Sequence, residues 1–420
     1  MKKSKIFLLI SLLAMFALML AACGGGEEPA AEAPAEEEAP ADEAVEEEAA
    51  PADEAAEEEA PAEEMEPVTL RLLTWQHPPT VEFLEGFIEE FETAHPNITV
   101  DWSIINANDL ATTQQTRLTA NDVDVIDSFG FANAAQPYMT DVDPPNWQQF
   151  IEAGLLMDIT DQPFVANYDE ATITDAGSYD GKVYSVNLGR VSYSGMFVNE
   201  DLLAANNLET PTTWSELVAA CETLTAAGAS CMTAGGADGW PIFVGAYGLL
   251  GSMYPDQAAL VEGLWTGDIT WDDANTIELW EKYQVFAQDM LEAGVTGLSH
   301  DATPARFAAG DVAFMPTGTW QASALEAAEA GFAWSYVPFP GSDNAEDNQF
   351  LFGKYDQGWA IAANTPNEDA AVDYLTMFSE PGNYEEFANA VGFIPTQPTA
   401  TLSTQLGEEV APYLETFKVG

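Results

Sequence analysis

Residues 68–105 read VTLRLLTWQHPPTVEFLEGFIEEFETAHPNITVDWSII, and this stretch decides the fold. Its first seven residues are mostly β-branched or leucine, which predicts a strand. Apolar residues then recur at helical spacing over 81–91, and Thr80, which follows two prolines, is the expected N-cap of that helix. Apolar and polar residues alternate over 98–104 and predict a second strand. Strand, helix and strand in this order begin an α/β pattern.

The alternation continues along the chain. Residues 108–120 are expected to be helical, and Val-Asp-Val-Ile at 123–126 is a candidate for a short buried strand. The whole pattern predicts an α/β fold with a parallel sheet. Further helices are expected at 196–206, 214–226, 275–292 and 367–378, and further strands at 182–187, 311–315, 334–337 and 357–362.

Two predicted strand ends carry side chains suited to ligand contact. Trp75, Gln76 and His77 follow the first strand, and Asp127 and Ser128 follow the third. In open α/β sheets, ligands bind beyond the carboxyl ends of the strands. These residues are therefore candidate ligand contacts, and a place in the core or on a lobe surface is the alternative interpretation.

Charge narrows the range of partners. The chain of 420 residues has 70 Asp and Glu but only 11 Lys and Arg, a formal net charge of −59. Residues 24–67 hold 19 of the acids and no base, and the first 23 residues hold three lysines, which leaves 51 acids and eight bases in residues 68–420. So few bases cannot form the patch that neutralises phosphates. The composition argues against nucleic acid as a partner and disfavours binding to an anionic lipid surface.

The N-terminus has the features of an export signal. Three lysines precede an apolar run over residues 6–22, and Cys23 and three glycines follow it. The run is short for a bilayer span, which needs about 20 residues, and a basic start with small residues at its end is typical of a secretory signal. Leu-Ala-Ala-Cys at 20–23 resembles a bacterial lipobox, which implies that residues 1–22 are removed and that Cys23 is lipidated. A plain signal peptide or an anchor helix is the alternative.

The next segment predicts a tether. Residues 24–67 are nearly all Gly, Ala, Glu, Asp and Pro, without an aromatic side chain, so they cannot form a core. Prolines interrupt any long helix, and the like charges favour extension. We expect residues 23–67 to hold a folded body away from the membrane. An acidic tail that binds a partner is the alternative.

Two cysteines remain besides Cys23. Cys221 and Cys231 lie ten residues apart and can close one disulfide in an oxidising compartment. Two free buried thiols are the alternative. Neither cysteine has a histidine nearby in the sequence, so a catalytic thiol is poorly supported.

The common catalytic and nucleotide-binding signatures are missing from the sequence. It contains no GxxxxGK[ST], GxGxxG, HExxH or GxSxG motif. The three histidines, His77, His95 and His300, do not have the spacing of metal ligands. Acidic residues are too numerous for one pair to stand out as a glycosidase couple. We therefore expect no cofactor, no metal site and no catalysis.

Several short motifs occur in a characteristic order. They are Phe-x-x-x-x-Pro-x-Ile-x-Val at 91–100, Gly-Leu-Leu-Met-Asp-Ile-Thr at 154–160, Gly-Lys-Val-Tyr-Ser-Val at 181–186, Phe-Val-Asn-Glu-Asp-Leu-Leu at 197–203, Thr-Pro-Thr-Thr-Trp-Ser-Glu at 210–216, Phe-Ala-Ala-Gly-Asp-Val-Ala-Phe-Met at 307–315, Gly-Thr-Trp at 318–320, Pro-Phe-Pro-Gly at 338–341 and Gly-Phe-Ile-Pro at 392–395. Together they resemble the sugar-binding type of extracytoplasmic solute-binding protein of bacterial ABC importers, related to maltose-binding protein. The resemblance covers residues 68–420, and it departs from the family at Asn187, where proline is usual.

The resemblance implies a periplasmic-binding-protein fold of two α/β lobes, joined by a hinge, with the ligand in the cleft between them. The chain is expected to cross between the lobes near 190–194, 335–340 and 378–382. The predicted N-lobe holds 68–190 and 341–378, and the predicted C-lobe holds 193–335 and 382–420.

The resemblance also implies which further residues contact the ligand. Trp320 matches the family's Gly-x-Trp turn, and Trp240 with Asp238 matches a Gly-rich turn at the cleft. Trp359, which follows Asp356, resembles the family's Gly-Gly-aromatic strand edge near the hinge. Arg190 and Tyr193 lie at the expected first hinge crossing. The set is Trp320, Trp240, Asp238, Trp359, Asp356, Arg190 and Tyr193. Aromatic rings fit the C–H faces of a sugar, and carboxylates or amides fit its hydroxyls. Core packing is the alternative for each of them.

With eight bases in the body, a neutral sugar or oligosaccharide is the expected ligand. A polyamine or another cation is the alternative within binding proteins, and a lipoprotein glycoside hydrolase is the alternative from another class. The expected partners are the transmembrane subunits of an ABC importer and, through the lipid, the membrane. We expect a monomer anchored to the outer face of the cell membrane.

Overall fold

The computed structural model describes residues 66–129, 131 and 134–419. The predicted signal, Cys23 and nearly all of the predicted tether lie outside these residues. No helix within the described part of the chain is long and apolar enough to cross a membrane.

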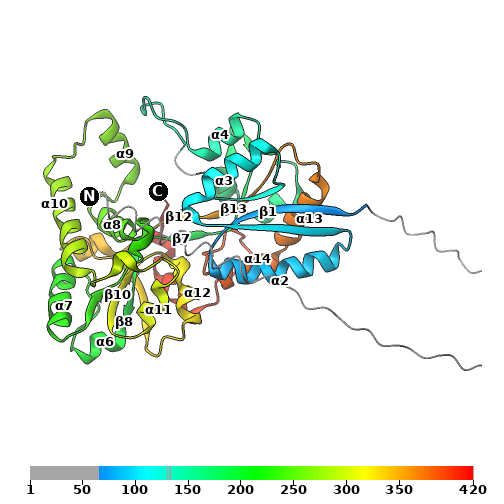
Figure 1. Cartoon of the computed structure of the whole chain (residues 1–420). Helices are drawn as coiled ribbons and strands as arrows, with labels where there is room; N and C mark the ends of the chain where they lie inside the picture. Colours follow the sequence, from blue (N-terminus) through cyan, green and yellow to red (C-terminus); the bar gives the residue numbers. More distant parts are fainter. Residues whose placement is uncertain (1–65, 130, 132–133, 420) are drawn as a thin grey trace, which may run out of the picture. The chain divides into compact units, whose positions relative to one another are not determined.

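A five-stranded sheet with the order β2-β1-β3-β13-β6 is built from distant parts of the chain (Figure 1). β1 (Val68–Trp75) lies between β2 (Ile98–Ile105) and β3 (Val125–Phe129) and is parallel to both, as predicted. β13 (Gln357–Ile361) is antiparallel to β3 and to β6 (Val186–Asn187). The carboxyl ends of β1 and β3 therefore meet at one edge of the sheet.

Helices cover both faces of this sheet. Leu70 and Leu72 of β1 pack in one buried cluster with α2 (Pro78–Ala94) and α13 (Glu368–Phe378). Leu73 and Trp75 point to the other face, because successive strand residues alternate, and they pack with α3 (Ala107–Ala120) and the 146–152 helix.

Helix α2 begins earlier than predicted. Its N-cap is His77, and Pro78 and Pro79 occupy the first turn, so the expected cap Thr80 lies inside the helix. Proline is favoured there because its φ angle is already helical and its missing N–H would have no partner in the helix.

Helix α14 (Pro381–Val391) packs with the helices of this first sheet. The Phe387 ring lies 5.3 Å from the Phe83 ring of α2 and 5.0 Å from the Phe378 ring of α13, centroid to centroid. The sequence assigned residues from 382 onward to the second lobe. The packing of α14 differs from that assignment. The chain joins the second sheet at α15 (Gln405–Val410), where Leu406 and Val410 are buried in one cluster with Trp334.

A second sheet has the order β11-β8-β10-β9, with β8 antiparallel to both neighbours. β8 is Gly195–Asn199, so the helix predicted at 196–206 is wrong for its first residues. A short, fully apolar run fits a buried strand as well as a helix, and here its residues are completely buried. The helix α6 (Glu200–Ala205) follows, and its cap is the Asn199 side chain, which accepts from the Leu202 N–H.

Larger helices pack on the second sheet. α7 (Trp214–Ala226) begins with a capping box between Thr213 and Glu216. α10 (Ala274–Val285) continues as a π-helical turn at Phe286–Met290. The remaining elements around this sheet are β9 (Ser230–Met232), β10 (Val312–Pro316), β11 (Trp334–Pro338), α8 (Trp240–Met253), α9 (Gln257–Thr266), α11 (Thr303–Ala308) and α12 (Ala322–Ala327).

Short strands complete the described structure. A three-stranded sheet has the order β14-β12-β7, and a hairpin pairs β4 with β5, so the strand predicted at 182–187 is divided between β5 and β6. The bounds are β4 (Ser178–Tyr179), β5 (Lys182–Val183), β7 (Arg190–Ser192), β12 (Phe352–Tyr355), β14 (Lys418–Val419), α4 (Asn146–Glu152) and α5 (Glu170–Ala176).

Candidate functional site

A cavity of about 1550 Å³ is the candidate site. Its walls come from the segment 134–139, which follows the first sheet's β3, and from α8 and α9 of the second sheet. Residues of β12 and β14 and the side chains of Tyr193 and Trp320 complete the lining.

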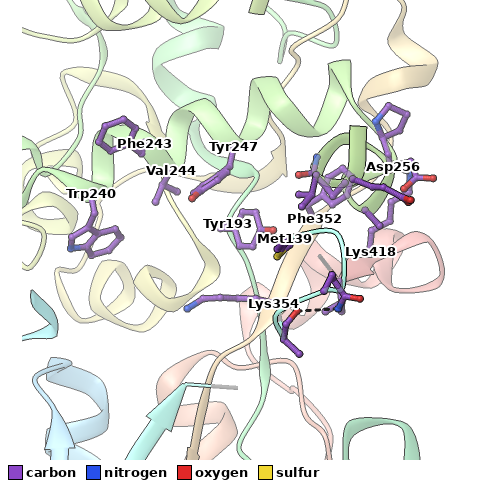
Figure 2. A pocket seen from close by; sticks show the side chains of 18 of the residues that line it. Met139, Tyr193, Trp240, Phe243, Val244, Tyr247, Asp256, Phe352, Lys354 and Lys418 are labelled. Atoms are coloured by element: carbon purple, nitrogen blue, oxygen red, sulfur yellow. Dashed lines mark hydrogen bonds between the residues drawn. The ribbon is translucent and has the colours of Figure 1, made fainter. Parts of the chain in front are cut away.

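One face of α8 supplies an aromatic wall (Figure 2). Trp240, Phe243, Val244 and Tyr247 are spaced by three or four residues, so they lie along one side of the helix. Phe243 is 57% exposed and Tyr247 is 45% exposed, although both are large apolar side chains. Tyr193, which follows β7, extends this wall with its ring centroid 5.0 Å from that of Tyr247.

A Gly-rich turn places Trp240 at the start of α8. A Cβ atom added to Gly235 would lie 2.6 Å from His300 Cα, so this close approach requires glycine. Asp238 accepts a 2.7 Å hydrogen bond from the His300 backbone N–H. The Trp240 ring then lies 4.6 Å from the His300 ring. The predicted residue Asp238 thus holds the turn together and does not line the cavity.

Trp320 lines the cavity but is only 4% exposed. Its indole folds back over Gly318, where an added Cβ would lie 2.0 Å from a ring carbon. The Trp240 and Trp320 rings are 6.1 Å apart and tilted by 54°. The Gly-x-Trp motif is therefore a turn in which glycine leaves room for the indole two residues later.

Replacing Gly318 with Ala should displace the Trp320 ring, because the new methyl group and the ring cannot occupy the same space. We expect the free energy of unfolding to fall by about 1 to 3 kcal/mol and the ligand affinity to fall with it. Urea unfolding and ligand titration measure both. Gly331→Ala is the matched control, because a Cβ there would have nothing within 4 Å. Equal stability of the two variants would contradict the role assigned to Gly318.

A buried polar cluster lies at the carboxyl ends of β1 and β3. Asp127 Oδ2 accepts from the Trp75 backbone N–H at 3.1 Å and from Gln357 Nε2 at 2.8 Å. His77 Nδ1 lies 2.9 Å from Thr80 Oγ1, and His77 Nε2 lies 3.1 Å from the Trp320 carbonyl oxygen. The cluster thus connects the first sheet to the turn that carries Trp320.

Burial shifts the proton equilibria of this cluster, and those of the nearby His300 and Tyr193, toward neutral forms. It raises the pKa of the Asp127 carboxyl to about 7. It lowers the pKa of His77 to about 4 and that of His300 to about 3. Burial also raises the pKa of the Tyr193 hydroxyl to about 12. Each shift has the direction that desolvation of a charged group produces.

Asp127 should make folding stability depend on pH. Its folded pKa of about 7 lies above the ordinary 3.8, so between these values the unfolded chain releases a proton that the folded chain keeps. Stability must therefore fall as pH rises through this window. Asp127→Asn keeps an oxygen acceptor for Trp75 and Gln357 but cannot titrate. We expect its free energy of unfolding to decline less with rising pH than that of the wild type.

Urea unfolding at a series of pH values across that window measures this difference, and circular dichroism checks that the variant is folded. Parallel curves for the two proteins would show that Asp127 ionises as freely in the folded state as in the unfolded chain.

Polar side chains at the cavity are of mixed charge. Asp256 is the N-cap of α9 and Glu262 lies within that helix, whereas Lys354 belongs to β12 and Lys418 to β14. Lys354 Nζ pairs with Asp356 at 2.7 Å. The Asp356 side chain is 2% exposed, so it acts through this pair. The site thus offers both hydrogen-bond acceptors and donors without a large excess of either charge.

The predicted site residues divide into three groups. Trp240, Trp320 and Tyr193 line the cavity. Eight others lie outside the lining. Gln76 is exposed, and Arg190 Cζ lies 5.6 Å from the centroid of the Phe417 ring. The remaining six are Trp75, His77, Asp127, Ser128, Asp238 and Asp356. Trp359 is 1% exposed and packs edge-on against Tyr374 and Phe378 in the core, which does not support direct ligand contact.

The sequence interpretation missed most of the lining. Phe243 and Tyr247 were detectable, because they follow Trp240 at i+3 and i+7 in a helix that the Gly-rich turn introduces. Phe352, Lys354 and Lys418 have no such local signal, since strand pairing brings β12 and β14 together. Within the described residues, no cluster of three or more His, Cys, Asp or Glu side chains is arranged to hold a metal ion.

Comparison with known proteins identifies related chains. A family model described as bacterial extracellular solute-binding protein matches residues 86–412. An uncharacterized ABC transporter extracellular-binding protein of Pyrococcus horikoshii is 25% identical over 238 residues, which cover 54% of this chain and 51% of that relative. The match thus spans about half the length of that relative.

Solved structures show the same fold at low identity. RafE, a protein of Streptococcus pneumoniae, in complex with raffinose has a TM-score of 0.70 at 19% identity and covers 84% of this chain and 89% of its own. A chitin oligosaccharide binding protein has a TM-score of 0.69 at 19% identity, covering 84% and 88%. A Bacillus licheniformis sugar transporter protein in complex with stachyose has a TM-score of 0.67 at 17% identity, with the same coverage. The likeness confirms the predicted two-lobe α/β fold.

Proposed function

The chain belongs to the bacterial extracellular solute-binding proteins, and on this premise we propose that it binds a neutral oligosaccharide in the cavity and delivers it to an ABC importer. We propose that the chain binds this ligand and does not catalyse a reaction on it. The proposal rests first on the aromatic wall of α8.

A pyranose ring has apolar C–H faces and a polar rim. Trp240, Phe243 and Tyr247 offer flat apolar surfaces along one side of the cavity, and flat rings suit the sugar faces. Asp256 and Lys354 offer an acceptor and a donor to hydroxyl groups nearby. Few convergent polar groups on a mostly apolar wall are typical of small-molecule sites.

The charges of the lining favour a neutral ligand over a polyamine. The carboxylates of Asp256 and Glu262 share the lining with the ammonium groups of Lys354 and Lys418, and Lys354 is also paired with the buried Asp356. A polyamine would gain attraction from the acids and repulsion from the lysines. The fold relatives in complex with raffinose and stachyose are consistent with this choice of ligand class.

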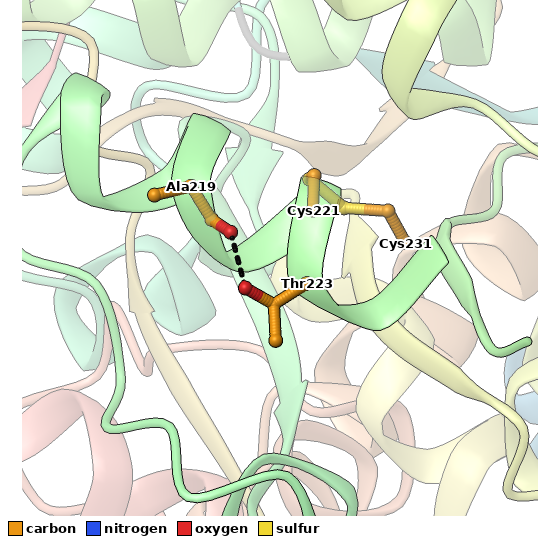
Figure 3. Close-up of a disulfide and its surroundings, with 4 residues drawn as sticks. All are labelled: Ala219, Cys221, Thr223 and Cys231. Carbon is orange, nitrogen blue, oxygen red and sulfur yellow. Dashed lines mark hydrogen bonds between the residues drawn. A yellow bond between two sulfur atoms is a disulfide. The ribbon is translucent and has the colours of Figure 1, made fainter. Parts of the chain in front are cut away.

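A disulfide supports export of the folded body (Figure 3). Cys221 of α7 and Cys231 of β9 are bonded, with Cα atoms 4.9 Å apart. Disulfides persist in oxidising compartments and are rare in the cytosol.

We further propose that the chain is a monomer, that lipid on Cys23 anchors it to the outer face of the membrane, and that residues 23–67 are its tether.

We also propose that ligand binding closes two lobes around a hinge. The N-lobe is proposed to hold residues 68–190 and 352–378, and the C-lobe residues 193–335, 341–348 and the end of the chain. Residues 342–348 differ from the sequence-based boundary at 341, because the Ser342 carbonyl accepts from the Trp214 N–H of α7 and Asn348 donates to the Thr212 carbonyl. The packing of α14 on α2 favours a return to the C-lobe after residue 391.

A thermal-shift screen tests the ligand class. We expect raffinose, stachyose or a chitin oligosaccharide to raise the unfolding midpoint, because a ligand that binds only the folded state stabilises it. Spermidine is the comparison ligand for the cationic alternative. A shift with spermidine and none with any sugar would overturn the proposal. Chromatography of the sugar after long incubation tests the hydrolase alternative, and consumption of the sugar would show catalysis.

A further inference from the structure

Exposed large apolar side chains concentrate in one part of the chain. Eleven such side chains occur within the described residues, and seven of them lie between residues 243 and 280. They are Phe243, Tyr247, Val261, Trp265, Trp271, Ile277 and Trp280. Contiguous exposed apolar surface on a soluble body marks a ligand groove or an interaction site.

Three of these side chains, Phe243, Trp271 and Trp280, form a series of ring contacts through the half-buried Tyr283, and these four residues are here called the aromatic ladder. The ring centroids of Phe243 and Tyr283 are 6.3 Å apart and nearly parallel, at 14°. Those of Tyr283 and Trp280 are 6.0 Å apart, and those of Trp280 and Trp271 are 6.1 Å apart. Phe243 also lines the cavity. The aromatic ladder is therefore continuous with the cavity wall and leads from it along α10 to the turn before that helix.

Core packing does not explain the outer end of the ladder. Trp271 is 63% exposed and Trp280 is 47% exposed. Side chains so exposed contribute little to the core, and their apolar faces are left against water. Adjacent exposed rings of this kind are typical of a surface that a ligand or a partner covers.

The charges around the ladder restrict what can cover it. Residues 265–283 contain five acids and one base, Lys282. Lys282 Nζ is already paired with Glu278 at 2.8 Å and donates to the Gly341 carbonyl at 2.9 Å. An anionic lipid surface would be repelled. A neutral sugar chain would stack on the rings, and the carboxylates would accept hydrogen bonds from its hydroxyls.

We propose that the aromatic ladder binds the outer rings of an oligosaccharide whose inner rings occupy the cavity. This inference rests on the proposed function and specifies its substrate class: a linear neutral oligosaccharide long enough to extend from Phe243 to Trp271. Continuity with the cavity favours a ligand that already enters it over a separate protein partner.

A chain-length series tests the inference. Using oligomers of the sugar that gives the largest thermal shift, isothermal titration should show affinity that rises with length in the wild type. In the double variant Trp271→Ala/Trp280→Ala the short oligomers should bind as in the wild type, whereas the long oligomers should lose affinity by about tenfold, since two stacked rings are removed. Unfolding midpoints check that both proteins are equally folded.

Trp265→Ala is the matched control. Trp265 is 42% exposed on the neighbouring helix α9, and no ring contact joins it to the ladder among the residues that the structure describes. We expect this variant to bind every oligomer as the wild type does. Affinity independent of length, or long oligomers that bind the double variant normally, would overturn the inference while leaving the proposed function intact. If no sugar of any length binds, both proposals fall together. Normal sugar binding with impaired stimulation of an importer would assign the ladder to a protein partner and also overturn it.

Discussion

Trp240→Ala should weaken oligosaccharide binding by about thirtyfold or more, since a central aromatic contact typically contributes over 2 kcal/mol. Trp240 begins the aromatic wall of α8 (Figure 2). Its ring lies 4.6 Å from the His300 ring and 6.1 Å from the Trp320 ring. Its removal deletes one indole face of the cavity lining and leaves the ligand's C–H face against water. Isothermal titration with the best oligosaccharide from the thermal screen measures the loss.

Conservative and distant replacements separate binding from folding in this experiment. Trp240→Phe keeps an aromatic face and should retain much of the affinity. Trp265→Ala removes an exposed tryptophan that does not line the cavity and should retain all of it. If Trp240→Ala binds as the wild type does, Trp240 does not contact the ligand and the cavity wall must be assigned differently.

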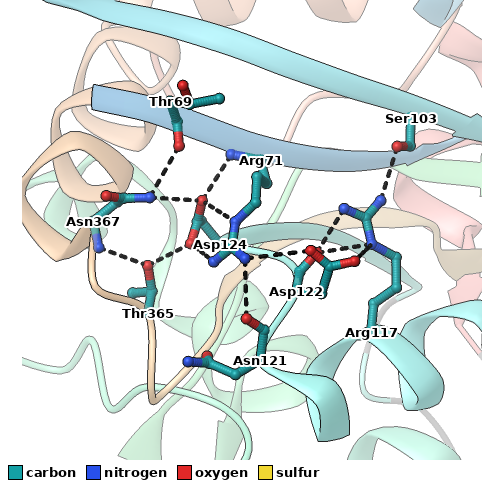
Figure 4. A network of polar contacts seen from close by, with 9 residues as sticks. All are labelled: Thr69, Arg71, Ser103, Arg117, Asn121, Asp122, Asp124, Thr365 and Asn367. Atoms are coloured by element: carbon teal, nitrogen blue, oxygen red, sulfur yellow. Dashed lines mark hydrogen bonds and ion pairs between the residues drawn. The ribbon is translucent and has the colours of Figure 1, made fainter. Parts of the chain in front are cut away.

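Asp124→Ala should lower the free energy of unfolding by about 3 to 5 kcal/mol, because it removes the buried partner of the partly buried Arg71 and leaves that cation only the exposed Asp122. The Asp124 side chain is completely buried. Its oxygens accept from Arg71 Nη2 at 2.6 Å and Nε at 3.0 Å, from Thr365 Oγ1 at 2.6 Å and from Asn367 Nδ2 at 3.1 Å (Figure 4). The carboxylate thus joins β1 to the segment between β13 and α13.

Asp122→Ala is the matched control within the same network. Asp122 is 63% exposed and lies 3.4 Å from Arg71 Nη1, and an exposed pair contributes at most about 1 kcal/mol. Urea unfolding compares the two variants. Equal losses of stability would show that burial of Asp124 adds nothing to its pairing with Arg71.

The Asp124 contribution should also disappear in acid. Burial alone would raise the pKa of this carboxyl, but the hydrogen bonds from Arg71, Thr365 and Asn367 hold it below the usual value. A depressed folded pKa stabilises the protein above the unfolded pKa, and that stability is lost as pH falls through the folded pKa. The stability difference between wild type and Asp124→Ala should therefore shrink below about pH 4.

Local patterns predicted the elements that depend on neighbouring residues. The β1–α2–β2 unit follows from spacing within a few turns, and so does α7, which occupies the predicted range 214–226. Residues 196–199 failed this logic, because a short apolar run has no period that separates strand from helix. These residues form a strand because they pair with β10 on one side and with β11 on the other.

The sequence by itself determined the α/β pattern, the scarcity of basic charge and the family motifs, because composition and short-range spacing carry that information. Only the tertiary structure decided which tryptophans face the cavity. Trp240 and Trp359 both follow a glycine in the sequence, yet one lines the cavity and the other is buried against Tyr374 and Phe378. Exposure of a side chain depends on what distant segments pack against it. Lys354, Lys418 and Trp320 meet at one cavity for the same reason, since pairing and packing of remote elements bring them together.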